Sequence, residues 1–132
     1  MIYAASFLDA EGCIVVYHRQ ETLENKGYFK LQVRVTQKYH IEPLEVFRDL
    51  WGGSIGRFGS GMFYWHAANR IAALSLEEMF PFLKVKREQA EEAIIFQKRR
   101  NKPGVRQSPD QKQMDLESTS KIKALKKVPI IS

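Results

Sequence analysis

The sequence has one cysteine, Cys13, and no long apolar run. A single thiol excludes a disulfide within the chain and a zinc site built from several cysteines. It also favours a reducing, intracellular setting. No apolar run approaches the roughly 18 residues of a membrane-spanning helix, and the N-terminus lacks the basic start of a secretory signal. We therefore expect a soluble intracellular protein with no membrane partner.

The sequence also lacks internal repeats and low-complexity tracts, and its 132 residues are the length of one domain. Hydrophobic residues make up 44% of the chain, enough for a sizeable core. A net charge of +6 favours an acidic partner, nucleic acid first. Residues 1–50 carry a net charge of −1, residues 51–100 carry +3 and residues 101–132 carry +4. Because the excess lies toward the C-terminus, specific recognition must be sought in how charge is placed within the folded part.

Residues 28–38 have the clearest periodicity in the sequence. Apolar side chains at 29, 31, 33 and 35 alternate with polar ones at Lys30, Gln32, Arg34, Thr36 and Lys38. This period of two predicts a strand with one face on a core and a cationic, hydrogen-bonding face outward.

The remaining patterns predict an α+β domain. We expect a helix over 2–12 that ends at a glycine, strands over 13–20 and 28–38, a loop over 21–27, a helix over 41–51, strands over 53–58 and 62–68, and helices over 69–80 and 85–100. Asn69 is a candidate N-cap. A capping box at Ser108 starts a last, basic helix over 108–127. Two hairpins without long crossovers imply an antiparallel sheet with helices on one face.

The first helix carries a family resemblance. Ser6 and Ala10 are small and four residues apart, so they share a helix face that a second backbone can approach; an ordinary core helix is the alternative. Residues 4–12, Ala-Ala-Ser-Phe-Leu-Asp-Ala-Glu-Gly, resemble the LAGLIDADG motif of homing endonucleases. The αββαββα order, Val-Thr-Gln-Lys at 35–38 and Pro-Phe-Leu-Lys-Val-Lys at 81–86 are also similar to that family. The resemblance covers about residues 2–100 of the single domain, 1–132.

The resemblance implies an active site at the end of this helix. Glu11, Gln37 and Lys86 match the family's catalytic residues, and Lys84 is the alternative to Lys86. Glu11 and the backbone carbonyl of Ala10 would bind Mg²⁺ or another divalent cation such as Mn²⁺, with Ca²⁺ as a non-cleaving substitute. Glu11 replaces the more usual aspartate, and Ile41 stands where close relatives carry a basic residue, with His40 or Lys38 as possible substitutes.

The closest subgroup has one motif per chain and acts as a homodimer, so the resemblance places Ala5, Ser6, Asp9 and Ala10 at a dimer interface. A two-stranded ribbon fits the major groove of double-stranded DNA, and the loop over 21–27 would reach the outer part of each half-site. The expected DNA-binding residues are Tyr17, Arg19, Tyr28, Lys30, Gln32, Arg34, Thr36, Lys38, Arg57 and Trp65, with Phe63 nearby. Phosphate contacts are expected from Arg99, Arg100, Lys102, Lys121, Lys123, Lys126 and Lys127.

The implied function is a metal-dependent, site-specific endonuclease that a mobile intron encodes and that cuts both strands of a long pseudo-palindromic target. Two alternatives share the fold: an RNA maturase that assists splicing of intron RNA, and a catalytically silent DNA-binding protein. The setting would be a chloroplast, a mitochondrion, or bacterial or phage-infected cytoplasm.

Overall fold

The alternating segment at 28–38 forms the long strand around which the fold is built. The computed structural model describes residues 1–19, 28–100 and 109–126. In chain order, its elements are α1 (Ile2–Glu11), β1 (Gly12–Arg19), β2 (Tyr28–Lys38), α2 (Glu42–Trp51), β3 (Ser54–Phe58), β4 (Met62–Ala68), α3 (Asn69–Met79), a 3₁₀ turn η1 (Phe80–Phe82), α4 (Arg87–Arg100) and α5 (Pro109–Lys126).

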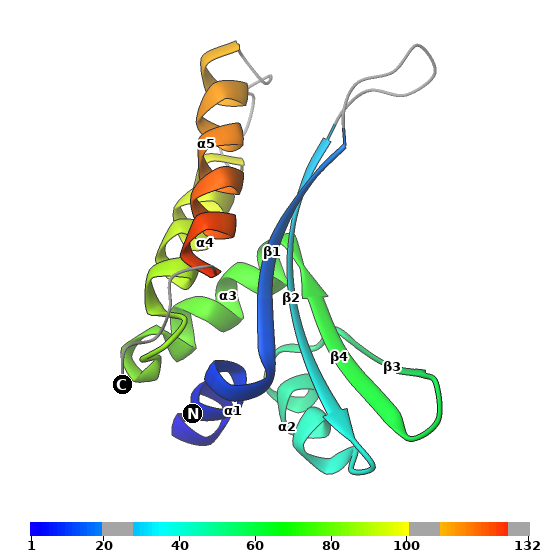
Figure 1. The fold of residues 1–132 in the computed structure, drawn as a ribbon. Coiled ribbons are helices and arrows are strands. Elements are labelled where there is room, and N and C mark those ends of the chain that lie inside the picture. Colours follow the sequence, from blue (N-terminus) through cyan, green and yellow to red (C-terminus); the bar gives the residue numbers. More distant parts are fainter. Residues whose placement is uncertain (20–27, 101–108, 127–132) are drawn as a thin grey trace.

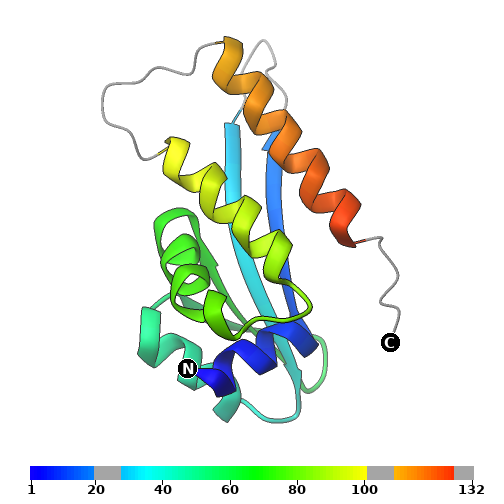
Figure 2. The same ribbon diagram turned by 90° about the vertical axis from the view of Figure 1, so that its left-hand side faces the viewer.

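The four strands form one antiparallel sheet in the order β1-β2-β4-β3. All the helices lie on one side of the sheet (Figure 1), and the view from that side shows them in front of the strands (Figure 2). The apolar positions of β2 are fully or almost fully buried beneath the helices. The α+β architecture expected from the sequence is confirmed, and the other face of the sheet is left uncovered.

The first helix passes into the first strand without a linker. The backbone N–H of Gly12 donates to the carbonyl of Leu8, which ends α1, and Gly12 is already the first residue of β1. Its φ of −95° is ordinary, so the glycine is needed for space and not for a left-handed conformation. A Cβ at this position would lie 2.6 Å from the carbonyl oxygen of Leu8.

Two helix starts differ from the sequence-based expectation. Asn69 is the first residue of α3, not its N-cap; Ala68 holds the cap position without a side-chain hydrogen bond. Asn69 adopts a positive φ of 52°, a conformation that asparagine tolerates better than most residues. The helix expected from 85 begins at Arg87. Within the described ranges, no helix is long and apolar enough to cross a membrane.

Candidate functional site

Hydrogen bonds connect the end of α1 to the segment that precedes α4. The carboxylate of Asp9 accepts hydrogen bonds from the backbone N–H groups of Lys84 (2.8 Å) and Lys86 (3.0 Å). The ammonium of Lys86 in turn donates to the backbone carbonyl of Asp9, at 2.6 Å. Of the two candidate lysines, both among the described residues, only Lys86 has its ammonium hydrogen-bonded to α1, and the residue that it contacts, Asp9, precedes Glu11 by two positions.

Glu11 and Gln37 lie at neighbouring element ends. Glu11 is the exposed last residue of α1. Because Gly12 pairs with Val35 in the β1–β2 ladder, the chain at Glu11 has reached the level of the last residues of β2. Gln37 is the half-buried penultimate residue of β2, opposite Phe63. Gln37 therefore lies near the end of β2, and no distortion of the strand is needed, because the β2–β4 pairing is regular through Lys38.

The oxygen atoms at this helix end suit a hard divalent cation. Glu11 offers a solvent-exposed carboxylate, and carbonyls in the last turn of a helix carry partial negative charge. Magnesium usually takes one or two carboxylates and completes its shell with water and substrate phosphate. The described residues contain no group of three or more His, Cys, Asp or Glu side chains able to hold a metal. The Glu11 carboxylate and the last-turn carbonyls are therefore the atoms at this helix end that suit such a cation.

Ile41 occupies the start of α2. Its carbonyl accepts hydrogen bonds from the backbone N–H groups of Leu44 (2.9 Å) and Glu45 (3.1 Å), and its side chain is half-buried. The neighbouring basic residues, Lys38 and His40, are both exposed. The Lys38 ammonium lies 5.0 Å from the centre of the Tyr39 ring.

The outer face of α1 carries two of the small residues expected at a dimer interface, whereas a third, Ala5, lies elsewhere. Ser6 and Ala10 are exposed, and Tyr3 extends the same face with 54% of its surface exposed. Ala5 was expected at a dimer interface but is completely buried. It lies on the core side of the helix with Leu8, three residues along, so the expectation for Ala5 is wrong.

The uncovered surface of the sheet, called the open face below, carries cationic and amide side chains. The register places Tyr17 opposite Lys30, Arg34 opposite His66, and Thr36 opposite Tyr64. The described side chains on this face include no carboxylate. The other predicted DNA-binding residues of β1 and β2 that belong to this face are Gln32 and Lys38. Arg19 pairs with Tyr28 at the far ends of these strands, but their side chains and residues 21–27 lie outside the described part.

The prediction that Trp65 contacts DNA is wrong, because its side chain is inaccessible. Trp65 is completely buried on the helix side of β4, where its indole N–H donates to the carbonyl of Gly52 at 2.8 Å. Its ring packs 5.0 Å from that of Phe47. Arg57 pairs with Phe63, two residues from Trp65, so it belongs to the same face of the sheet as Trp65. Its side chain is nevertheless exposed, and a DNA contact from Arg57 stays a prediction.

The observed register places two residues that were not expected to bind DNA, Tyr64 and His66, on the open face. The amide nitrogen of Gln32 lies 3.2 Å from Nδ1 of His66, and the Tyr64 and His66 rings are 5.5 Å apart. Burial lowers the pKa of His66 below its ordinary 6.5, and the charges of Arg34 and Lys30 lower it further. His66 is therefore neutral at pH 7. The sequence held no clear signal for this placement, because aromatic residues stand at both parities of β4.

The basic residues of the last two helices are largely paired with acids. Asp115 is completely buried between Arg99 (3.2 Å) and Arg100 (3.7 Å), and Lys121 pairs with Glu92 at 3.2 Å. These pairs join α4 to α5 on the helix side of the sheet (Figure 2). Phosphate contacts from Arg99, Arg100 and Lys121 stay a prediction and would have to compete with these acids. Lys123 is exposed on α5. Lys102 and Lys127, and the side chain of Lys126, lie outside the described part.

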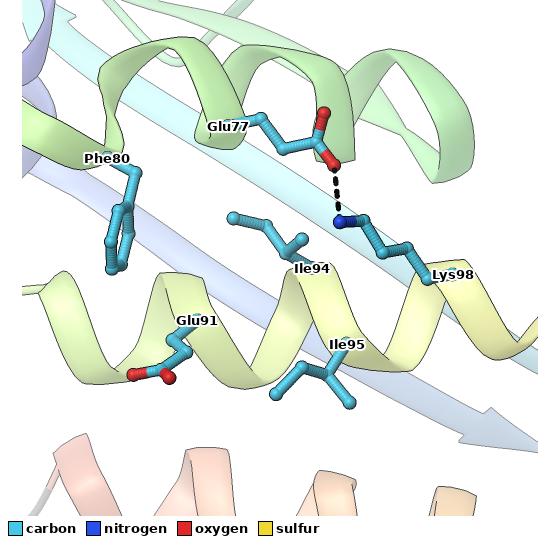
Figure 3. A pocket seen from close by; sticks show the side chains of 6 residues that line it. All are labelled: Glu77, Phe80, Glu91, Ile94, Ile95 and Lys98. Carbon is cyan, nitrogen blue, oxygen red and sulfur yellow. Dashed lines mark ion pairs between the residues drawn. The ribbon is translucent and has the colours of Figure 1, made fainter.

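A pocket of about 320 Å³ lies between α3 and α4 (Figure 3). Phe80, Ile94 and Ile95 line it, together with Glu91 and an ion pair of 3.6 Å between Glu77 and Lys98. It belongs to the helix layer and is lined by none of the residues expected in the active site.

No family model matches the chain, and no curated protein matches it. Several solved structures share its fold. The homing endonuclease I-CvuI, in complex with the I-CreI target, has a TM-score of 0.80 and 22% identity over 99% of this chain and 84% of that one. The archaeal intron-encoded homing endonuclease I-Vdi141I, complexed with DNA, has a TM-score of 0.79 and 16% identity over 98% of this chain and 87% of that one.

The LAGLIDADG homing endonuclease I-GzeII, in complex with its DNA target, has a TM-score of 0.71 and 16% identity over 93% of this chain. Only 43% of the I-GzeII chain is covered. These likenesses show that the chain has the LAGLIDADG homing endonuclease fold, as the motif at residues 4–12 predicts.

Proposed function

We propose that this protein is a site-specific DNA endonuclease that acts as a homodimer and cuts both strands of a long, pseudo-palindromic target. One observation carries the proposal. The ammonium of Lys86 is held near the end of the motif helix by the carbonyl of Asp9, two residues before Glu11, and the same helix leads directly into a sheet whose open face carries cations and no described carboxylate. The proposed cutting centre and DNA-binding surface would adjoin at Gly12.

The open face suits binding to a polyanion and reading of base edges. Lys30, Arg34 and Lys38 supply positive charge for phosphate attraction. Arginine and lysine can donate to guanine, and glutamine can pair with adenine in the major groove. The neighbours I-CvuI and I-Vdi141I were both solved with DNA, which supports the same partner for this chain.

The chemistry we propose is hydrolysis of a phosphodiester bond. Glu11 and the Ala10 carbonyl would hold Mg²⁺, or Mn²⁺ in its place. When bound, such a cation polarises the phosphate and lowers the pKa of an attacking water. The Lys86 ammonium would offset the negative charge that develops on the phosphate, and the Gln37 amide would orient the water. Structures of I-CvuI have been obtained with Mg²⁺ and with Ca²⁺, which supports use of a divalent cation here.

A dimer would supply the second half of this centre. One chain brings one Glu11, whereas cutting two strands calls for two such sites. Ser6 and Ala10 are exposed on one side of α1 and are small enough to let a second α1 approach closely. This chain matches only 43% of the I-GzeII chain, which supports the idea that it provides half of a complete enzyme.

The test is selection from a library of long randomised duplexes in Mg²⁺, with Glu11→Gln compared with wild type. We expect wild type to cut both strands of the selected site, and Glu11→Gln to bind that site without cutting it. Glu42→Gln is the matched control, because Glu42 is an exposed carboxylate on α2; it should cut normally. Binding by wild type without cleavage in Mg²⁺ or Mn²⁺ would indicate a silent DNA-binding protein. Binding of intron RNA but no duplex DNA would indicate a maturase.

A further inference from the structure

Arg34 lies against a pair of aromatic rings on the open face. Its guanidinium carbon lies 4.4 Å from the centre of the Tyr64 ring and 5.9 Å from that of Phe58. The two rings are themselves 5.7 Å apart. They come from β4 and β3, whereas Arg34 comes from β2, so three strands contribute to one arrangement, which we call the arginine clamp.

The clamp limits the freedom of a side chain that is otherwise exposed. A free arginine loses rotamer entropy when it is fixed in one conformation. Stacking on Tyr64 offsets part of that cost before DNA arrives, because a guanidinium is attracted to the face of an aromatic ring. Arginine held in one plane is suited to a bidentate contact, and guanine presents two acceptors, O6 and N7, in the major groove.

Neighbouring side chains leave Arg34 without a described anionic partner on this face. His66, directly opposite in the β2–β4 ladder, is neutral at pH 7 and close to the Gln32 amide. The guanidinium is therefore not neutralised by a carboxylate there, in contrast to Arg99 and Arg100 of α4, which pair with Asp115.

The strand register locates the clamp along a bound duplex. Gly12 pairs with Val35, so Glu11, the last residue of α1, lies level with Thr36. Arg34 is two residues from Thr36 along β2, and this separation is its offset from Glu11. At about 3.3 Å per residue the offset is about 7 Å, or about two base pairs at roughly 3.4 Å each. In the proposed homodimer, the clamp would occur once in each half-site, close to the cutting centres.

We propose that Arg34 reads a guanine at one mirrored pair of positions in the inner part of the target, and that Tyr64 is the positioning residue that makes this reading selective. The inference rests on the proposed function and adds a base and a location to it. Arg34 makes the contact; Tyr64 acts through Arg34 and not on the DNA.

The test measures base preference by binding alone, with selection in Ca²⁺ followed by affinity measurements on single-base variants of the selected site. Wild type should prefer guanine at one mirrored pair by about ten-fold or more, the range of a good bidentate contact. Arg34→Lys and Tyr64→Leu should both lose most of that preference and keep the preferences elsewhere. Tyr64→Phe should retain it, because the ring face remains.

Tyr39→Leu is the matched control, since Tyr39 is an exposed tyrosine that follows β2 and belongs neither to the clamp nor to the expected DNA-binding residues; it should keep the guanine preference. Thermal unfolding of Tyr64→Leu confirms that the variant is folded when assayed. The inference is overturned if Arg34→Lys weakens binding equally for all sequences, which would indicate a phosphate contact, or if Tyr64→Leu leaves the preference intact. A wild type that selects a target lacking this guanine refutes the clamp alone, whereas one that selects no duplex refutes the proposed function.

Discussion

The hydrogen bonds between Asp9 and the segment before α4 predict a specific effect of Asp9→Ala. The substitution removes both acceptors, which lie 2.8 and 3.0 Å from the backbone nitrogens of Lys84 and Lys86. It leaves the backbone carbonyl that accepts from the Lys86 ammonium. Hydrogen bonds to a charged group contribute about 1.5–3 kcal/mol each when well shielded. Because Asp9 is half-buried and Lys84 exposed, we expect about 2 kcal/mol for the pair.

A loss of about 2 kcal/mol should lower Tm by about 6–10 °C in a domain of this size. Cleavage should fall further than DNA affinity, because the backbone that carries Lys86 is released while the open face is intact. Asp9→Asn keeps one acceptor and should lose about half as much stability.

Thermal unfolding and single-turnover cleavage of a pre-bound target measure the two effects. Asp49→Ala, at an exposed aspartate of α2, is the matched control and should change neither. An Asp9→Ala variant with wild-type Tm and wild-type cleavage would refute the role assigned to these hydrogen bonds.

Three further predictions follow from the same structure. Gly12→Ala should destabilise the fold by about 1–3 kcal/mol, because its Cβ meets the Leu8 carbonyl; unchanged denaturant unfolding would contradict this. Trp65→Phe should lose about 2 kcal/mol with its hydrogen bond to Gly52 and its packing, yet leave DNA affinity of the folded protein unchanged; weaker binding with wild-type stability would reverse the assignment. Since the folded pKa of His66 lies below 6.5, its stabilising contribution is present above pH 6.5 and is lost as pH falls through the folded value. Wild type should therefore lose more stability than His66→Gln between pH 7 and pH 5, and parallel losses would refute this.

The strand pattern of β2 could be predicted because its two faces differ sharply in polarity. The second hairpin could not be assigned in the same way. In β4, large aromatic residues stand at both parities, so Tyr64 and Trp65 are equally plausible core residues from the sequence. The choice depends on a distant feature, the space beneath the helices where Trp65 meets Phe47 and the Gly52 carbonyl.

Long-range polar contacts account for the other differences. The net charge of the C-terminal region suggested free cations, but the carboxylate of Asp115 is brought between Arg99 and Arg100 only when α5 packs on α4. The choice of Lys86 over Lys84 likewise depends on a contact with Asp9 across 77 positions of sequence. Local periodicity carries no information about such pairs.

The fastening of α1 to residues 84–86 also has a consequence for the order of folding. All four strands lie between residues 12 and 68, and short hairpins close quickly because their contacts are local. The contact of Asp9 with Lys86 encloses that whole stretch, so it closes a far longer loop and bears a larger entropic cost. A folding chain would therefore assemble its sheet before the contact of Asp9 with Lys86. The proposed cutting centre would be completed last, and only in molecules whose sheet is already in place.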